Sequence, residues 1–208
     1  MKVTTVCNFY RKPMKLTKGQ ETRIRIIKIS TELFLKKGLY NITFSQIAKA
    51  AKITQPAIYR HFKDMDDLFL ESCKYWVTES VIYINQNADN LESAELQIRQ
   101  YLERHLIYTV KNRSHDALLF GLYYYSMRSQ KMLNFYLDLK NRSLLRLKRI
   151  LNFGNIDRSW AVQDVDALAE TIHSLLVGEV IKILIEPDQQ AAQIAFERMI
   201  NLFKKLTV

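Results

Sequence analysis

Apolar residues recur at spacings of three and four along most of the chain, and this spacing predicts helices rather than strands. Only 5 glycines and 3 prolines interrupt the 208 residues, so few positions break the pattern. We therefore expect an all-α protein with nine helices. The expected helices cover residues 18–37, 44–51, 55–61, 65–87, 93–111, 115–128, 130–153, 161–186 and 188–206.

Particular residues mark the expected ends of these helices. Gly38 follows the first helix and suits the left-handed position that often closes a helix. Thr43 and Thr54 precede the second and third helices, where a threonine oxygen can accept a bond from a first-turn N–H group. Gly154 and Pro187 are expected to end the seventh and eighth helices.

The stretch ITQPAIYRHF, residues 53–62, places a proline inside the short third helix. Pro56 falls in the first turn, where a backbone N–H has no intrahelical partner to lose, so it starts the helix instead of breaking it. The preceding helix, FSQIAKAA, is joined to it by a tight turn, which is the pattern of a helix-turn-helix. The residues spaced to pack between the two segments are Ile47, Ala48, Ile53 and Ile58.

Positive charge is concentrated in the first third of the chain. Residues 1–70 contain 14 of the 31 Lys and Arg and 5 of the 21 Asp and Glu, a balance of +9 within the total of +10. Such an excess is typical of a protein that binds a polyanion, because phosphate contacts release counterions. Charge alone equally permits a solvated basic surface or a patch that meets anionic lipid.

The chain offers little for catalysis or metal binding. Cys7 and Cys73 lie far apart and have no metal-ligand spacing, and the sequence has no glycine-rich phosphate loop. The four histidines occur singly, at His61, His105, His115 and His173. We therefore expect no metal, no cofactor and no enzyme activity. No apolar run approaches the roughly 18 residues of a membrane span, and the N-terminus lacks the apolar core of a signal peptide, so a cytoplasmic protein without a membrane partner is expected.

The stretch TFSQIAKAAKITQPAIYRHFKDMDDLF resembles the DNA-binding region of the TetR family of bacterial repressors. Members share a Thr-capped helix, an Ile-Ala core and a Tyr-x-x-Phe or similar ending to the recognition helix. The motif covers about residues 20–70. Residues 1–17 have no helical period and carry several basic residues, so we expect a mobile basic arm there. The resemblance implies a three-helix helix-turn-helix domain over 18–63 and a larger helical effector-binding and dimerisation domain over 64–208.

Two positions depart from the family pattern. Lys52 stands where the family usually has glycine in the turn, so either this lysine is left-handed or the turn differs slightly. Met65 stands where many relatives carry a phosphate-binding lysine, and Lys63 can take that role.

A recognition helix presents its N-terminal residues to base edges, while flanking groups bind phosphates. Gln55 can bond adenine N6 and N7, Pro56 and Ala57 offer apolar contact to a thymine methyl, and Arg60 suits guanine or a phosphate. The full set of expected DNA contacts is Thr43, Ser45, Thr54, Gln55, Pro56, Ala57, Tyr59, Arg60, His61 and Lys63.

The helix expected over 161–186 carries two apolar stripes and therefore needs two neighbours. One neighbour is its own core, and the other is the same helix of a second copy, with Gly178 allowing close approach. The expected dimer residues are Thr171, Leu175, Gly178, Ile181, Phe196, Met199 and Phe203. A homodimer would set two recognition helices about 34–36 Å apart, the distance between successive major grooves on one DNA face.

Aromatic residues of the fifth and sixth helices suggest a pocket for a small apolar or aromatic effector, although such stripes are also typical of an ordinary core. The expected effector contacts are Tyr101, His105, Tyr108, Tyr124 and His173. The resemblance implies that an effector among helices four to eight moves helix four and releases a palindromic DNA operator. The expected function is thus a ligand-responsive repressor, with a TetR-like activator and an effector-independent DNA-binding protein as alternatives.

Overall fold

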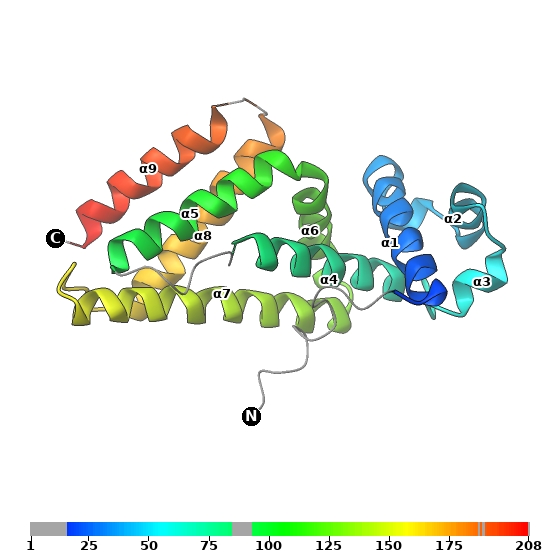
Figure 1. Cartoon of the computed structure of the whole chain (residues 1–208), viewed down its shortest axis with the longest axis horizontal. Coiled ribbons are helices and arrows are strands. Elements are labelled where there is room, and N and C mark those ends of the chain that lie inside the picture. Colours follow the sequence, from blue (N-terminus) through cyan, green and yellow to red (C-terminus); the bar gives the residue numbers. More distant parts are fainter. Residues whose placement is uncertain (1–15, 85–92, 187, 189, 208) are drawn as a thin grey trace. The chain divides into compact units, whose positions relative to one another are not determined.

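The computed structural model describes residues 16–84, 93–186, 188 and 190–207. Within these residues it contains nine α-helices and no strand, which confirms the expected all-α class (Figure 1). A three-residue 3-10 helix spans Leu39–Asn41. The α-helices are α1 (Lys18–Lys37), α2 (Phe44–Ala51), α3 (Gln55–Tyr59), α4 (Met65–Ile84), α5 (Ala94–Lys111), α6 (Arg113–Ser126), α7 (Gln130–Ile156), α8 (Val165–Ile185) and α9 (Ala191–Leu206).

The chain divides into two compact units, and the boundary between Val81 and Ile82 falls inside α4. The first unit holds α1 to α3 and most of α4, and the second holds the end of α4 and α5 to α9. The arm expected over residues 1–17 lies outside the described residues except for Leu16 and Thr17. Thr17 caps α1, because Gln20 N donates to Thr17 Oγ1 at 3.3 Å and Thr17 N donates to Gln20 Oε1 at 2.9 Å.

Gly38 closes α1 as expected. Its backbone is left-handed in φ, at 79°, and its N–H donates to Phe34 O at 2.8 Å. Helix α7, by contrast, does not end at Gly154 but continues to Ile156. A Cβ added at Gly154 would lie 1.9 Å from the Trp160 ring, so this glycine lets the ring pack against the helix instead of stopping it.

Other helix ends also differ from the expected ones. Helix α3 ends at Tyr59 rather than residue 61, α8 begins at Val165 rather than 161, and α9 begins at Ala191 rather than 188. Asp164 explains the start of α8, because its Oδ1 accepts a bond from Ala167 N at 2.9 Å and so caps the first turn. The stop expected at Pro187 lies outside the described residues.

The first unit packs around one apolar core. The rings of Phe34 and Phe69 meet edge to face with centroids 5.4 Å apart, and Trp76 Nε1 donates to Thr31 Oγ1 at 2.9 Å. Full burial of a large apolar side chain such as phenylalanine stabilises the folded state by about 1.5–3 kcal/mol. The most deeply buried apolar residues of the unit include Ile26, Ile27, Ile47, Ile58, Phe62, Leu68 and Phe69.

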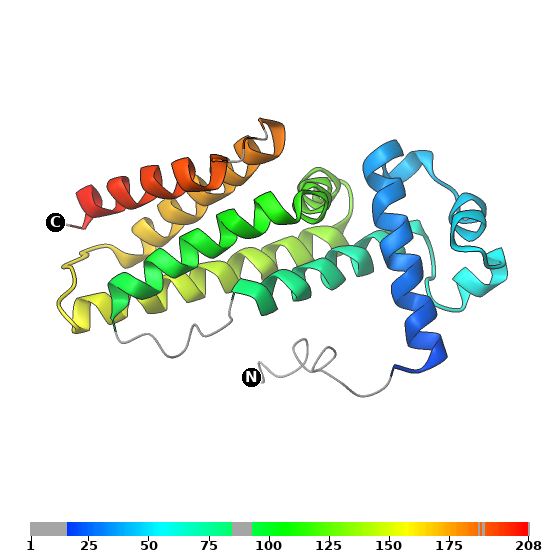
Figure 2. The ribbon, with the colours of Figure 1, turned by 45° about the horizontal axis from the view of Figure 1, so that its top comes forward.

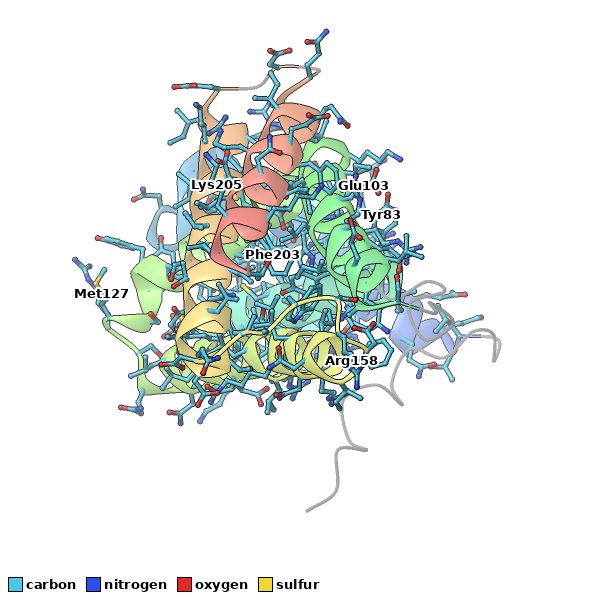
Figure 3. All side chains as sticks on the ribbon, turned by 90° about the vertical axis from the view of Figure 1, so that its left-hand side faces the viewer. Tyr83, Glu103, Met127, Arg158, Phe203 and Lys205 are labelled. Carbon is cyan, nitrogen blue, oxygen red and sulfur yellow. The ribbon has the colours of Figure 1, made fainter. Side chains whose placement is uncertain are left out.

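In the second unit, α9 packs along α5 and α8, and α7 packs against α5 and α8 (Figures 1 and 2). Phe203 of α9 lies among these helices, whereas Met127 at the end of α6 projects into solvent (Figure 3). The Phe203 and Trp160 rings meet edge to face with centroids 5.1 Å apart. Helix α9 therefore closes the core of its own unit.

Lys52 adopts the left-handed conformation that the sequence left open, with φ 53° and ψ 46°. Lys52 directly follows the last residue of α2, and Ile53 N donates a hydrogen bond back to Ala48 O at 3.0 Å. A left-handed backbone is unfavourable for a residue with a Cβ, by about 1–2 kcal/mol. The turn between α2 and α3 therefore holds local strain at this residue.

Replacement of Lys52 by glycine is expected to raise the free energy of unfolding by about 0.5–1 kcal/mol, because relief of this strain exceeds the extra freedom of the unfolded chain. Thermal unfolding measures the change. The matched control is Lys49→Gly, an exposed position within α2, where glycine should lower stability by about 1 kcal/mol. A loss of stability in Lys52→Gly would contradict the strained turn.

Candidate nucleic-acid interface

Helices α2 and α3 are joined by a short turn and packed through a small apolar contact (Figure 1). Ile47 and Ile58 are fully buried, and the small side chain of Ala48 is 5% exposed. These apolar residues form the face on which α2 and α3 pack together. The polar residues of the same segment, such as Lys49, Thr54 and Gln55, are exposed to solvent. The helix-turn-helix expected over this segment is present.

The start of α2 is fixed by a reciprocal pair of hydrogen bonds. Gln46 N donates to Thr43 Oγ1 at 3.3 Å, and Thr43 N donates to Gln46 Oε1 at 3.1 Å. The N–H groups of Phe44 and Ser45 remain outside the hydrogen-bond ladder of the helix, and helix N-termini of this kind attract anions. The start of α2 can therefore bind a phosphate through backbone N–H groups.

Pro56 lies in the first turn of α3, as expected. Thr54 precedes that helix, but its side chain makes no capping bond, unlike the side chain of Thr43. Among the expected DNA contacts, Ala57 and His61 are half-buried. The others are exposed: Thr43, Ser45, Thr54, Gln55, Pro56, Tyr59, Arg60 and Lys63.

Tyr59 combines an anchored ring with access to solvent. Its ring meets that of Phe44 edge to face, with centroids 4.9 Å apart, and the residue is nevertheless 56% exposed. The contact joins the last residue of α3 to the first residue of α2. The phenol can thus donate to a phosphate from a restricted position.

His61 lies beside two arginines. Burial lowers its pKa below the ordinary value, and the charges of Arg23 and Arg60 lower it further. In the free protein the imidazole is therefore neutral at neutral pH, and its N–H can donate to a phosphate.

Three of the five expected effector residues come together inside the second unit. Tyr101 OH and Ser143 Oγ are 2.8 Å apart, and Ser143 Oγ is 3.1 Å from His173 Nδ1. His105 Nδ1 lies 2.7 Å from Tyr101 O, and burial lowers the pKa of His105 to about 4. Both histidines are neutral at neutral pH, because burial also lowers the pKa of His173.

The other two effector candidates lie elsewhere. Tyr108 is buried, with its OH 3.1 Å from His115 Nδ1. Tyr124 is 48% exposed on α6, under the guanidinium of Arg128. A shallow groove beside Trp160 is lined by residues other than the five candidates.

The expected dimer residues separate into two groups. On α8, Thr171, Leu175 and Gly178 are exposed, and Ile181 is half-buried. The three expected residues of α9 are instead buried in the core of their own unit, because α9 turns that face toward α5: Phe196, Met199 and Phe203. A second copy cannot reach these three side chains without opening the protomer.

The described residues hold no cluster of His, Cys, Asp and Glu suited to a metal ion. Cys73 is buried, and burial raises the pKa of its thiol, so it carries no reactive thiolate. Cys7 lies outside the described residues. No described helix is long and apolar enough to cross a membrane.

Sequence reasoning missed several residues of these sites. Gln46 could have been found from the Thr-x-x-Gln spacing that signals a capping box. Ser143 interrupts an apolar stripe of α7, which is a weak signal for a buried polar contact. Arg23 and Glu71 pair across α1 and α4, and no local pattern links residues so far apart.

Comparison with known proteins agrees with this geometry. Residues 26–72 match the family described as "Bacterial regulatory proteins, tetR family". An HTH-type transcriptional regulator from Staphylococcus aureus is 30% identical over 133 residues, which are 58% of this chain and 68% of that protein. The chain belongs to the TetR family.

A second relative, the HTH-type transcriptional regulator AcrR from Shigella flexneri, is 47% identical over 53 residues. The match covers 26% of this chain and 25% of AcrR, so the chain spans about a quarter of that relative. The family match over residues 26–72 includes both α2 and α3. Both relatives are described as transcriptional regulators.

Solved structures resemble the fold over most of its length. A transcriptional regulator from Saccharomonospora viridis in complex with choline has a TM-score of 0.79 at 19% identity and covers 88% of this chain and 96% of its own. A TetR transcription regulator from Haloarcula marismortui has a TM-score of 0.78 at 14% identity and covers 90% and 99%. These similarities confirm the TetR-like architecture.

Proposed function

We propose that the protein is a ligand-responsive transcriptional repressor of the cytoplasm that binds a palindromic operator as a homodimer. The observation that carries this proposal is the division of the α2–α3 segment into a buried apolar side and an exposed polar side. The exposed side offers hydrogen-bond donors and positive charge where DNA presents acceptors and phosphates.

Within this segment the proposed roles follow the position of each residue. Gln55, Pro56 and Ala57 form the start of α3 and read base edges in the major groove. Tyr59, His61 and Lys63 follow the reading residues and hold phosphates, together with the start of α2. Arg60, which is exposed at the end of α3, binds a guanine or a phosphate.

The proposed dimer surface is the exposed face of α8, extended by exposed apolar residues of α9. Gly178 lies at its centre, and apart from its chain neighbours and the adjacent backbone of α8 no atom lies within 4 Å of an added Cβ, so a second helix can approach closely. From α9, Ile194 and Leu202 are the proposed contacts in place of the three buried residues, because their side chains are 48% and 37% exposed. An ion pair from Arg198 to Glu179, with N and O 2.8 Å apart, joins the two helices beside this face.

For the effector we propose a small molecule with an apolar body and a polar group. Support comes from the hydrogen-bonded chain of Tyr101, Ser143 and His173 inside the second unit. The choline complex of the Saccharomonospora viridis protein supports a small-molecule site in this fold. Binding would alter DNA affinity through a coupling free energy of about 1–3 kcal/mol.

One observation favours an effector-independent DNA-binding protein as a second candidate. Tyr101 and Leu106 are 1% and 0% exposed, so the core near the proposed effector site is closely filled. That candidate predicts a DNA affinity that no small molecule changes. An activator differs only in where the operator lies relative to the promoter.

The division between base reading and phosphate binding can be tested on the duplex that the protein selects from a random pool. Gln55→Ala is expected to cost about 1–3 kcal/mol per half-site and to relax preference at one position, because a base contact is lost. Lys63→Ala is expected to weaken binding to all sequences and to lower the salt slope by about one per protomer. Affinity titrations over a series of salt concentrations measure both effects.

Uniform loss of affinity in both variants would contradict these assigned roles. The matched control is Lys36→Ala, which removes an exposed lysine from the end of α1. We expect this variant to retain the sequence preference.

Gly178→Leu is expected to convert the dimer to a monomer, because the larger side chain blocks approach of the second α8. The change should not harm the protomer, since its Cβ meets open space and leucine favours helix more than glycine does. Sedimentation measures the mass. Asn141→Leu, at an exposed position of α7, is the control and should remain dimeric. An unchanged mass for Gly178→Leu would remove this residue from the interface.

A further inference from the structure

Arg23 of α1 lies at the junction of three elements of the first unit. Its guanidinium carbon is 5.1 Å from the centre of the Phe62 ring, and its Nη2 donates to Glu71 Oε2 of α4. Glu71 also accepts a bond from Lys74 Nζ at 2.8 Å. A planar guanidinium can lie against a ring and still pair with a carboxylate through its edge.

Phe62 is the residue through which this cluster reaches α3. It is 1% exposed, and its N–H donates to Ile58 O at 3.0 Å, which ties it to the end of the helix. A helix as short as Gln55–Tyr59 has no stability of its own. Its orientation therefore depends on contacts such as the one between Phe62 and Arg23.

Both partners of the ion pair are partly shielded from water. The side chains of Arg23 and Glu71 are 29% and 22% exposed. Burial raises the pKa of Glu71, but hydrogen bonds from Lys74 and Arg23 outweigh burial, and the pKa lies below its ordinary value. The carboxylate is thus ionised at neutral pH and holds the guanidinium in place.

We propose that Arg23 and Glu71 are positioning residues for DNA reading: together they hold the end of α3 against α1 and α4, and neither contacts DNA. The inference rests on the proposed DNA-binding function. The guanidinium is occupied by the carboxylate and the ring, so it is held away from a phosphate. Glu71 is negatively charged, so the phosphates of DNA would repel it.

Arg23→Met keeps an apolar stem against Phe62 and removes the ion pair. On the selected duplex we expect affinity to fall about tenfold or more, while affinity for random-sequence duplexes falls much less. The slope of log affinity against log salt should match that of the wild-type protein. A direct phosphate contact would instead lower that slope by about 0.9 per protomer, and this result would overturn the proposal.

The matched control is Arg25→Met, which removes the same charge from an exposed position of α1. It should keep the ratio of specific to non-specific affinity. An equal loss of this ratio in Arg23→Met and Arg25→Met would show a general charge effect and overturn the positioning role.

Glu71→Gln removes a negative charge, whereas Arg23→Met removes a positive one, so the two variants change the electrostatic attraction to DNA in opposite directions. Removal of a negative charge favours DNA binding on electrostatic grounds, whereas loss of the pair with Arg23 should lower specific affinity. We expect a fall on the selected duplex and none in Glu79→Gln, an exposed position of α4. Specific binding by Glu71→Gln as tight as wild type, with thermal unfolding confirming a folded protein, would overturn the proposal.

A readout in the free protein separates this inference from the proposed function. Because the Arg23 charge helps to lower the pKa of His61, Arg23→Met should raise that pKa toward its ordinary value, and Arg25→Met should not. An NMR titration of the His61 ring measures it, and an unchanged pKa would contradict the placement of Arg23. A wild-type protein with no duplex preference would overturn the proposed function and the inference with it. Normal specificity in either Arg23→Met or Glu71→Gln, with the wild-type protein specific, would overturn the inference but not the proposed function.

Discussion

A helix of five residues cannot hold its shape in water by itself, and this constraint governs the first unit. Helix α3 exists because Ile58 and Phe62 are buried beneath it, at 0% and 1% exposure. Pro56 fixes the backbone of its first turn, and Tyr59 rests its ring on Phe44. The rest of the unit therefore serves as a frame that fixes one short segment with its polar side outward.

The second unit answers a different requirement. In the proposed homodimer, two such segments must be held at one distance to meet successive major grooves, so the proposed dimer surface must be rigid. Helix α9 contributes by closing the core of its own unit with Phe196, Met199 and Phe203. This closure leaves the outer face of α8 exposed for the proposed dimer, while the chain of Tyr101, Ser143 and His173 lies inside.

Periodicity and end signals in the sequence predict the number of helices, the role of Pro56 and the end of α1 at Gly38, because these depend on neighbours in the chain. They do not reveal which apolar face meets which partner. The sequence pattern around Phe196 fits a dimer surface as well as a core. The packing of α9 against α5 in the structure shows that this residue is in the core. From the sequence alone, Gly154 is interpreted as the end of a helix. In the folded structure, a glycine is needed there because the Trp160 ring packs against the helix at that position. The pairing of Arg23 with Glu71 is a long-range contact and leaves no local pattern.

The proposed function requires α3 to lie against base pairs, with two copies of the helix held at the spacing that the proposed dimer sets. Selection of bound duplexes from a random pool at moderate salt tests this most directly. The proposed function predicts enrichment of a palindrome whose half-sites are centred about 10–10.5 base pairs, or a multiple of one helical turn, apart. Recovery of duplexes with no common sequence would contradict it.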